Sequence, residues 1–275
     1  MADIWAPKRR IERAYKRALL AVMRKLAKLL AGLDNPFQIV KRIRAFAYSK
    51  EMDDYALATA SRMVTHLFTD AGRTWRQAAR RNSQGRLINE ALRKELQGSI
   101  NGAVRHQIER NATIIKSLPL DVSKLVTEHI LAESMKGVRA IDIAEQIKEL
   151  FPEKSNARAE LIARTETSKT STALTRARSE NLGVGWYVWR TSEDSRVRDS
   201  HALMNGVLVR WSDPPSPEQF DGEKRTYGHY HAGEIFYCRC YGEPVIDRDL
   251  IVWPAKVYYA GRIQRMTRKQ FESIM

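Results

Sequence analysis

The chain has 275 residues, of which 43% are hydrophobic and 29% charged, and this balance is that of a folded protein rather than a disordered one. No apolar run approaches the roughly 18 residues needed to cross a bilayer, and cations interrupt the first thirty residues, so neither a membrane span nor a secretory signal is expected. Cys238 and Cys240 are only one residue apart, which excludes a disulfide framework and leaves free thiols or metal ligands.

The net charge of +15 is concentrated at the two ends of the chain. Residues 1–50 hold thirteen Lys and Arg against three Asp and Glu, and the last twenty residues hold five against one. The middle of the chain is nearly balanced. A polyanionic partner is therefore expected to contact the ends.

The first element is an amphipathic helix over residues 8–33, where apolar residues recur every three or four positions from Ile11 to Leu33. Gly32 and Pro36 bracket its expected end. Nine cations occupy the remaining face: Lys8, Arg9, Arg10, Arg13, Lys16, Arg17, Arg24, Lys25 and Lys28.

Three interpretations compete for this helix. In the first, the apolar stripe docks on the other helices and the cations are solvated. In the second, the cations bind DNA phosphates without sequence preference. In the third, the helix lies on a membrane surface. Membrane binding ranks third because no lipidation signal accompanies the helix. The nine cations are therefore the candidate nucleic-acid interface, and no membrane partner is expected.

From residue 51 to about 150 the helical period continues, with breaks expected near Asn82–Gly85, at Leu118–Pro119 and at Lys136–Gly137. A further end is expected at Phe151–Pro152, with Ser155–Asn156 capping the next helix. Residues 1–155 are thus predicted to form an extended, mostly helical N-terminal region.

The helix that follows runs to about Leu182 and is rich in small hydroxyl residues over 165–172, which permit close approach of another backbone. Beyond Gly183 the period changes, and 185–190, 206–211 and 239–246 are predicted as strands. The fold class is therefore α+β, with a small α+β domain at 156–246 and a basic tail at 247–275.

The strand-rich region also gathers the residues that zinc prefers. His201, His231, Cys238 and Cys240 would supply four tetrahedral ligands, with His229 as a substitute. A metal would fix the long loop between residues 212 and 233, which has no apolar core of its own. In the alternative interpretation the thiols are buried and the histidines bond loop carbonyls.

The order of several motifs resembles that of a known family. Ala163–Glu166 lies on a helix, Asp194–His201 follows Trp189, and His231–Glu234 precedes Cys238–Arg239–Cys240. Over roughly 156–246 this succession resembles the C-terminal domain of Mu-F-type minor head proteins of tailed phages, also called phage head morphogenesis proteins. Many members carry Cys-x2-Cys where this chain has Arg198 and His201, so the chain resembles the Arg/His variants.

The resemblance implies a minor capsid protein, present in few copies inside the head or near the portal vertex, and in the host cytoplasm during assembly. Its implied partners are the portal protein, the major capsid or scaffolding protein and packaged double-stranded DNA. On this interpretation the protein is not an enzyme. The rival is a metal-dependent nuclease in which the three histidines and nearby Asp194, Asp199 or Glu234 hold the ion. ADP-ribosyl transfer ranks low because the hydroxyl run is helical and no Gly-rich nucleotide loop is present.

Overall fold

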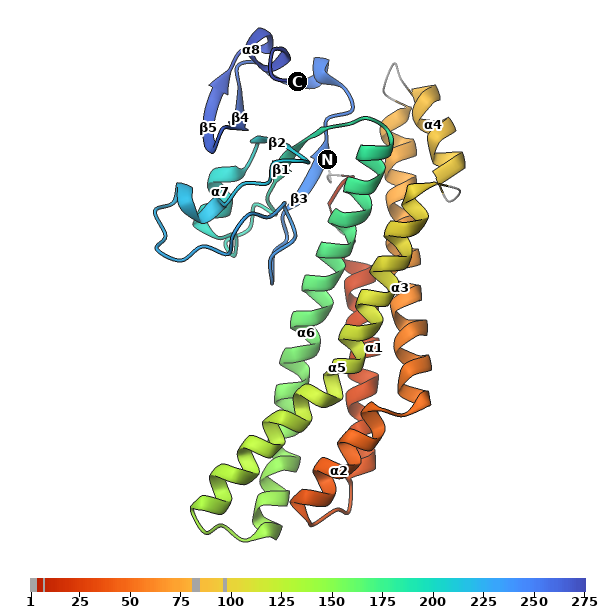
Figure 1. Cartoon of the computed structure of the whole chain (residues 1–275), viewed down its shortest axis with the longest axis vertical. Coiled ribbons are helices and arrows are strands. Elements are labelled where there is room, and N and C mark those ends of the chain that lie inside the picture. The colour runs from red at the N-terminus through yellow and green to blue at the C-terminus, as the bar shows by residue number, and fades with distance from the viewer. Residues whose placement is uncertain (1–3, 7, 81–84, 96–97) are drawn as a thin grey trace. The chain divides into compact units, whose positions relative to one another are not determined.

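The computed structural model describes residues 4–6, 8–80, 85–95 and 98–275. Six long or medium helices come first, and a five-stranded sheet with short helices follows (Figure 1). This confirms the α+β class expected from the sequence. The helices are α1 (Arg9–Leu30), α2 (Pro36–Ala47), α3 (Lys50–Ala79), α4 (Gly85–Lys94), α5 (Ser99–Met135), α6 (Ala140–Asn181), α7 (Asp199–Met204) and α8 (Arg268–Glu272). The strands are β1 (Trp186–Arg190), β2 (Leu208–Arg210), β3 (Tyr241–Pro244), β4 (Ala255–Tyr259) and β5 (Arg262–Met266).

The chain divides into two compact units. Unit 1 comprises Met1–Lys8, His66–Val104 and Thr165–Met275, and unit 2 comprises Arg9–Thr65 and Arg105–Arg164. The α3, α5 and α6 helices contribute residues to both units. The units therefore do not follow the division at residue 155 that the sequence suggested.

Unit 2 is a helical bundle in which the apolar stripe of α1 is buried. The buried residues of α1 follow the predicted spacing: Ile11, Tyr15, Leu19, Val22, Met23, Leu26 and Leu30. The Tyr15 hydroxyl donates to Asn111 Oδ1 at 3.4 Å on α5, and the Tyr55 hydroxyl donates to the Ala18 carbonyl at 2.9 Å. The docking interpretation of the first helix is thus confirmed for its apolar face.

Two predicted breaks are wrong, because α5 runs through Pro119 and α6 runs through Pro152. Proline in a helix interior costs about 3 kcal/mol. Buried residues continue at helical spacing on both sides of Pro119: Ile115, Leu118, Val122, Val126 and Ile130. Burial of this stripe offsets the cost, so α5 continues past Pro119, and α6 continues through residues 155–156, where a new helix start was predicted.

The other predicted ends stand. Asn35 caps α2 by accepting from the amides of Phe37 and Gln38, with Pro36 at the first helical position. Gly137 and Gly183, both at positive φ, follow the ends of α5 and α6. Most of the break predicted at Asn82–Gly85 lies outside the described residues, between the end of α3 and the start of α4.

Unit 1 holds the sheet, whose strand order is β3-β1-β2-β4-β5. β1 pairs antiparallel with both β2 and β3, β2 pairs parallel with β4, and β4 pairs antiparallel with β5. One face packs a core around Tyr187, Trp189 and Trp211, and a second core forms around Trp186 and Phe271. Trp75 and Leu92 of the helical part pack with partly buried Leu182 and Ile246 in the same unit.

Residues 247–275 were expected to be a basic tail and instead complete the sheet. β4 and β5 form a hairpin closed by Ala260 and Gly261, at φ 51° and 75°. A two-residue turn with both φ values positive matches the twist of the strands it joins. The alternation of apolar and polar residues that marks a strand is weak in β5, because Met266 is its one buried residue and most of its other residues are polar or charged. Within the described residues, no helix combines the length and the apolar character needed to cross a bilayer.

Candidate functional site

The hydroxyl-rich part of α6 provides a close seat for the loop that carries the cysteines. Thr172 Oγ1 donates to the Ala232 carbonyl at 2.7 Å. A Cβ built on Gly233 would lie 2.7 Å from Thr172 Oγ1 and 2.8 Å from both Ser168 Oγ and the Cys240 carbonyl. The small residues of α6 and the glycine of the loop therefore serve one purpose, which is to let the loop reach the helix.

Three of the predicted metal ligands meet in this loop region. His201 Nδ1, on α7, lies 3.5 Å from Cys238 Sγ and 3.4 Å from Cys240 Sγ. The three ligand atoms all lie within 4.8 Å of one another, and each residue is at most 3% exposed. We call His201, Cys238 and Cys240 the Cys–His cluster.

The spacing suits a tetrahedral ion. Ligand atoms about 2.0–2.3 Å from a tetrahedral zinc lie roughly 3.5 Å from one another. The two nitrogen–sulfur distances match this value, and two thiols with one imidazole are soft donors that zinc prefers. The donor set therefore fits zinc, and His201, Cys238 and Cys240 are the residues that would hold it.

The two thiols differ in proton affinity. The hydrogen bond from Cys240 lowers the pKa of Cys238 well below its ordinary value, and His201 contributes to the same shift. The Cys238 sulfur and burial raise the pKa of Cys240. One thiolate is thus favoured in the cluster without a metal.

A second layer of residues orients the imidazole. His201 Nε2 lies 2.9 Å from the Tyr230 hydroxyl, which donates a short hydrogen bond to Glu218 Oε1. Burial raises the pKa of Tyr230, and the Glu218 carboxylate raises it further, so the phenol keeps the proton that it donates. His201 Nε2–H can then donate to the phenol oxygen, which frees Nδ1 to face the sulfurs.

Neither Tyr230 nor Glu218 was a sequence candidate. Tyr230 stands between the two histidines that were singled out, which is the one signal the sequence offered. Glu218 lies in the short helix Pro217–Phe220 of a proline-bearing loop, and nothing in its neighbours marks it.

The structure does not bring His231 or His229 into the Cys–His cluster. His231 is buried with Nδ1 3.2 Å from the Tyr187 hydroxyl and Nε2 3.4 Å from Arg176 Nη1. Because a guanidinium only donates, Nε2 is the unprotonated nitrogen and is already occupied. His229 is exposed, with Nδ1 2.9 Å from the Pro214 carbonyl.

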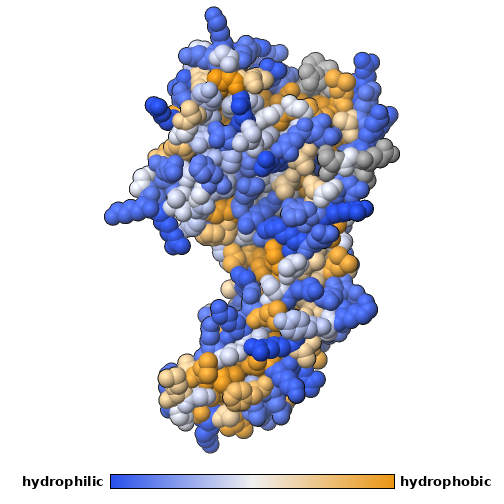
Figure 2. Space-filling model, in the orientation of Figure 1, coloured by the Kyte–Doolittle hydropathy of each residue, from blue (hydrophilic) through white to orange (hydrophobic). Residues whose placement is uncertain are grey.

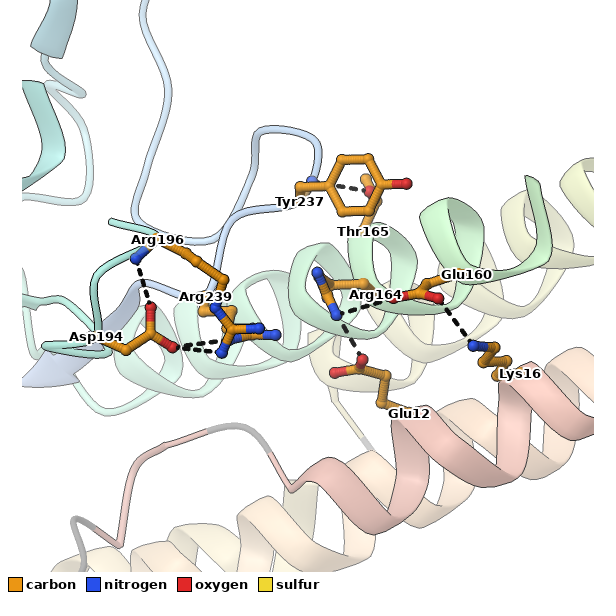
Figure 3. A network of polar contacts seen from close by, with 9 residues as sticks. All are labelled: Glu12, Lys16, Glu160, Arg164, Thr165, Asp194, Arg196, Tyr237 and Arg239. Atoms are coloured by element: carbon orange, nitrogen blue, oxygen red, sulfur yellow. Dashed lines mark hydrogen bonds and ion pairs between the residues drawn. The ribbon is translucent and has the colours of Figure 1, made fainter. Parts of the chain in front are cut away.

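The arginines of the motifs hold the cluster's loops. Arg198 Nη2 donates to the Phe236 carbonyl at 3.0 Å, two residues before Cys238. Arg239 Nη1 donates to Asp194 Oδ2 at 2.8 Å, and Arg196 bonds the same carboxylate (Figure 3). The hydrogen bond from Arg196 lowers the pKa of Asp194. Asp194 thus ties the 194–201 motif to Cys-Arg-Cys.

The contacts of the Arg164–Thr165–Glu166 motif also stabilise the fold around the helix that carries it. In unit 1 the Tyr237 amide donates to Thr165 Oγ1 at 3.2 Å (Figure 3). In unit 2 the Arg164 guanidinium pairs with Glu160 at 3.2 Å and with Glu12 at 3.5 Å. Tyr237 is held at φ 55°, a conformation that side chains other than glycine seldom adopt, next to Cys238.

The cations predicted to bind DNA divide into two groups. Six are exposed: Arg9, Arg10, Arg13, Arg17, Arg24 and Lys28. Lys16 pairs with Glu160 at 2.9 Å, Lys25 pairs with Glu51, and Lys8 Nζ donates to the Ile4 carbonyl at 3.1 Å. The exposed group lies on the solvent face of α1, opposite the buried stripe.

Comparison with known proteins identifies the region around the cluster. Residues 124–242 match the model of the family described as phage Mu protein F like protein. An uncharacterized protein of Haemophilus influenzae is 34% identical over 139 residues, which cover 50% of this chain and 28% of that protein. No solved structure matches the chain significantly. The match begins at residue 124 rather than 156, so the part of the chain that is similar to this family includes the C-terminal part of α5 and all of α6.

Proposed function

We propose that the protein is a minor capsid protein that assists head morphogenesis of a tailed phage, as a structural component present in few copies. The family match over residues 124–242 is the observation that supports this role. The site of action would be the head interior or the portal vertex, after assembly in the host cytoplasm. Its partners would be portal protein, major capsid or scaffolding protein, and packaged double-stranded DNA.

The geometry of the Cys–His cluster favours a structural role over an enzymatic one. Cys238 and Cys240 are each 3% exposed and His201 is 2% exposed, so a substrate has no route to them in this conformation. Two of the three acidic groups of the rival nuclease are engaged elsewhere: Asp194 with two arginines, and Glu234 Oε2 with the His231 amide at 2.7 Å. The third, Asp199, is exposed and lies outside the Cys–His cluster. We therefore propose no catalytic residue.

Zinc is the cofactor that we propose for the cluster. His201, Cys238 and Cys240 would hold it, with Tyr230 and Glu218 behind the imidazole. The ion would fasten the loop over 212–240 to α7, and it would add to the apolar contacts that Tyr230, Ala232 and Ile235 of this loop make in the core around Trp189. His231 would instead support the fold through Tyr187.

The test is complementation of particle assembly. A genome lacking this gene is supplied with the parent protein or with an Asp194→Asn, Arg239→Gln double variant, and heads are counted by electron microscopy. Without the protein we expect few DNA-filled heads, and we expect the double variant to restore fewer than the parent. Normal yields of filled heads in the deletion, or nicking of plasmid by the pure protein with Mg²⁺, Mn²⁺ or Zn²⁺, would overturn the proposal.

A further inference from the structure

The α2 helix of unit 2 presents a second face in addition to the one it buries. Ile39 and Ile43 are fully buried, but a different set lines two hollows beside the helix. The set follows helical spacing: Phe37, Val40, Lys41, Arg44 and Tyr48. The two aromatic side chains at the ends of this set are largely exposed, Phe37 at 72% and Tyr48 at 75%.

The opposite wall of both hollows is the second half of α5. Its lining residues are Leu120, Ser123, Lys124, Thr127, Glu128, Ile130 and Leu131. The hollows measure about 390 and 420 Å³ and share Arg44 and Thr127, so they adjoin. Arg44 Nε donates to Ser123 Oγ at 3.3 Å where they meet. We call the combined feature the α2–α5 groove.

One half of the groove, the hollow lined by Phe37, Val40, Ile130 and Leu131, has the apolar character of a binding surface. Ile130 is buried in its floor and Leu131, 60% exposed, stands at its rim. Figure 2 shows hydrophobic surface gathered over the end of unit 2 that carries α2. Contiguous apolar surface on a hollow favours an interaction site, whereas scattered single residues do not.

The walls select a helix as the occupant. Both walls are α-helices, whose backbone amides and carbonyls are already bonded within each helix. An extended strand placed here would find no backbone partners, whereas a helix satisfies its own. The twelve residues from Phe37 to Tyr48 span about 16 Å along the helix axis, which accommodates roughly three turns of a partner helix. Anchors spaced i, i+3, i+4 and i+7 would fill such a groove.

The charges that line the groove favour a partner helix of negative net charge. Lys41, Arg44 and Lys124 line it against one acidic residue, Glu128. Lys41 and Lys124 are exposed. Cations at the rim favour a partner with carboxylates beside its apolar stripe, and they disfavour a second copy of the basic α1 helix.

We propose that the α2–α5 groove binds an acidic amphipathic helix of a partner protein. The inference rests on the proposed function, because a head-assembly protein must dock on another protein of the particle. It adds the place of docking and the chemistry of the partner. The surface is far from the Cys–His cluster in sequence, so the metal and the groove can be tested separately.

The probe is a fluorescein-labelled helical peptide of about fifteen residues, with leucines at i, i+3, i+4 and i+7 flanked by glutamates. Binding to the full chain is followed by fluorescence anisotropy. A matched peptide carries lysines in place of the glutamates. We expect the acidic peptide to bind and the basic one to bind at least about tenfold more weakly.

Variants then locate the binding. Phe37→Ala with Leu131→Ala, and separately Lys41→Glu with Lys124→Glu, should each weaken binding by about tenfold or more. Leu87→Ala is the control, since Leu87 is also 60% exposed but lies on α4. All four substituted groove residues are exposed, so melting curves should match the parent.

Several outcomes would overturn the proposal: no binding by the acidic peptide, equal binding by the basic one, or binding that survives both groove variants. Sedimentation of a parent dimer that the Phe37→Ala, Leu131→Ala variant dissolves would show that a second copy occupies the groove. If the acidic peptide does not bind but the yield of filled heads still depends on the protein, the groove proposal is rejected and the assembly role stands. If the yield of filled heads does not depend on the protein, the assembly role is rejected.

Discussion

The Tyr230 hydroxyl lies 2.9 Å from Nε2 of His201, on the side of the imidazole opposite the two cysteine sulfurs. This contact favours one ring orientation and one tautomer, since the phenol donates its own O–H to Glu218 and its oxygen is left to accept from Nε2–H. A chain of three side chains therefore prepares Nδ1 as a ligand or as an acceptor from a thiol.

Tyr230→Phe should separate this outer layer from the cluster itself. The substitution leaves the Glu218 carboxylate, fully buried, without its hydroxyl partner, and we expect a loss of about 1–3 kcal/mol in unfolding free energy. Zinc affinity should fall by about 10- to 100-fold if the ion is bound. Urea unfolding and a zinc competition assay measure the two effects. Tyr227→Phe, at an exposed position, is the control and should change neither.

Metal content tests the cluster directly. Elemental analysis should find about one zinc per chain, and a chelator should lower the melting temperature. Cys240→Ser should abolish the bound zinc, whereas His229→Ala should retain it because His229 lies outside the cluster.

Protein prepared without metal tests the packing interpretation. If Cys238→Ser still lowers its melting temperature, the buried thiol stabilises the domain through packing, independently of zinc. A Cys238→Ser, Cys240→Ser double variant that melts like the parent but fails to complement assembly would contradict both interpretations.

Gly233 and Gly228 form a matched pair for testing the close contact between the cysteine-bearing loop and α6. Both have positive φ, 88° and 84°, but only Gly233 has neighbours within 4 Å of an added Cβ. Gly228→Ala should cost about 1 kcal/mol for the backbone conformation alone. Gly233→Ala should cost roughly 1–3 kcal/mol more, because Thr172 and the Cys240 carbonyl must move. Equal losses in urea unfolding would contradict the close approach.

The sequence predicted the fold class because both periods were strong. The spacing from Ile11 to Leu30 in α1 and the strand residues around Trp186 and Val209 lie where the period placed them. It failed at Pro119 and Pro152, where local preference opposes a buried stripe that only the folded bundle supplies. Local signals cannot weigh a cost of about 3 kcal/mol against contacts made far along the chain.

The candidate site shows the same division. His201, Cys238 and Cys240 were found from residue type, and the structure brings them together. His231 has the right type and the right neighbourhood, yet Arg176, 55 residues earlier on α6, occupies its nitrogen. Such a contact depends on the path of the loop over the helix, which spacing along the chain does not reveal.

The buried His231 should make stability depend on pH. Burial lowers its pKa from 6.5 to about 4, and the Arg176 charge contributes to the shift. Between these values the unfolded chain binds the proton and the folded chain does not, so stability is full above pH 6.5 and falls toward pH 4. The total loss is about 3 kcal/mol at 1.36 kcal/mol per pH unit.

Urea unfolding at several pH values between 7 and 4 checks this dependence. His231→Gln removes the titrating group and should flatten the curve, whatever its effect at pH 7. His229→Gln replaces an exposed histidine and should leave the slope as in the parent. A parent curve that is flat over this range would contradict the prediction.

The exposed face of α1 should contribute non-specific DNA affinity through phosphate contacts. The buried stripe means that deleting the helix would disrupt unit 2, so the charges must be removed with the helix intact. Arg9, Arg13, Arg17 and Arg24 are exposed and can be replaced by glutamine, which is also a good helix former. The control replaces four exposed arginines of α3 and α4 by glutamine: Arg73, Arg76, Arg86 and Arg93.

Both variants lose four positive charges, so only the location of the charges differs. The slope of log K against log salt should become shallower by about 0.9 for each DNA phosphate that is no longer neutralised, or up to about 3.6 in the α1 variant. The control should keep most of the parent slope. Filter binding or anisotropy with a duplex of arbitrary sequence, titrated with salt, gives these slopes. Equal changes in both variants would mean that net charge alone matters, and an unchanged slope in the α1 variant would remove α1 from the DNA interface.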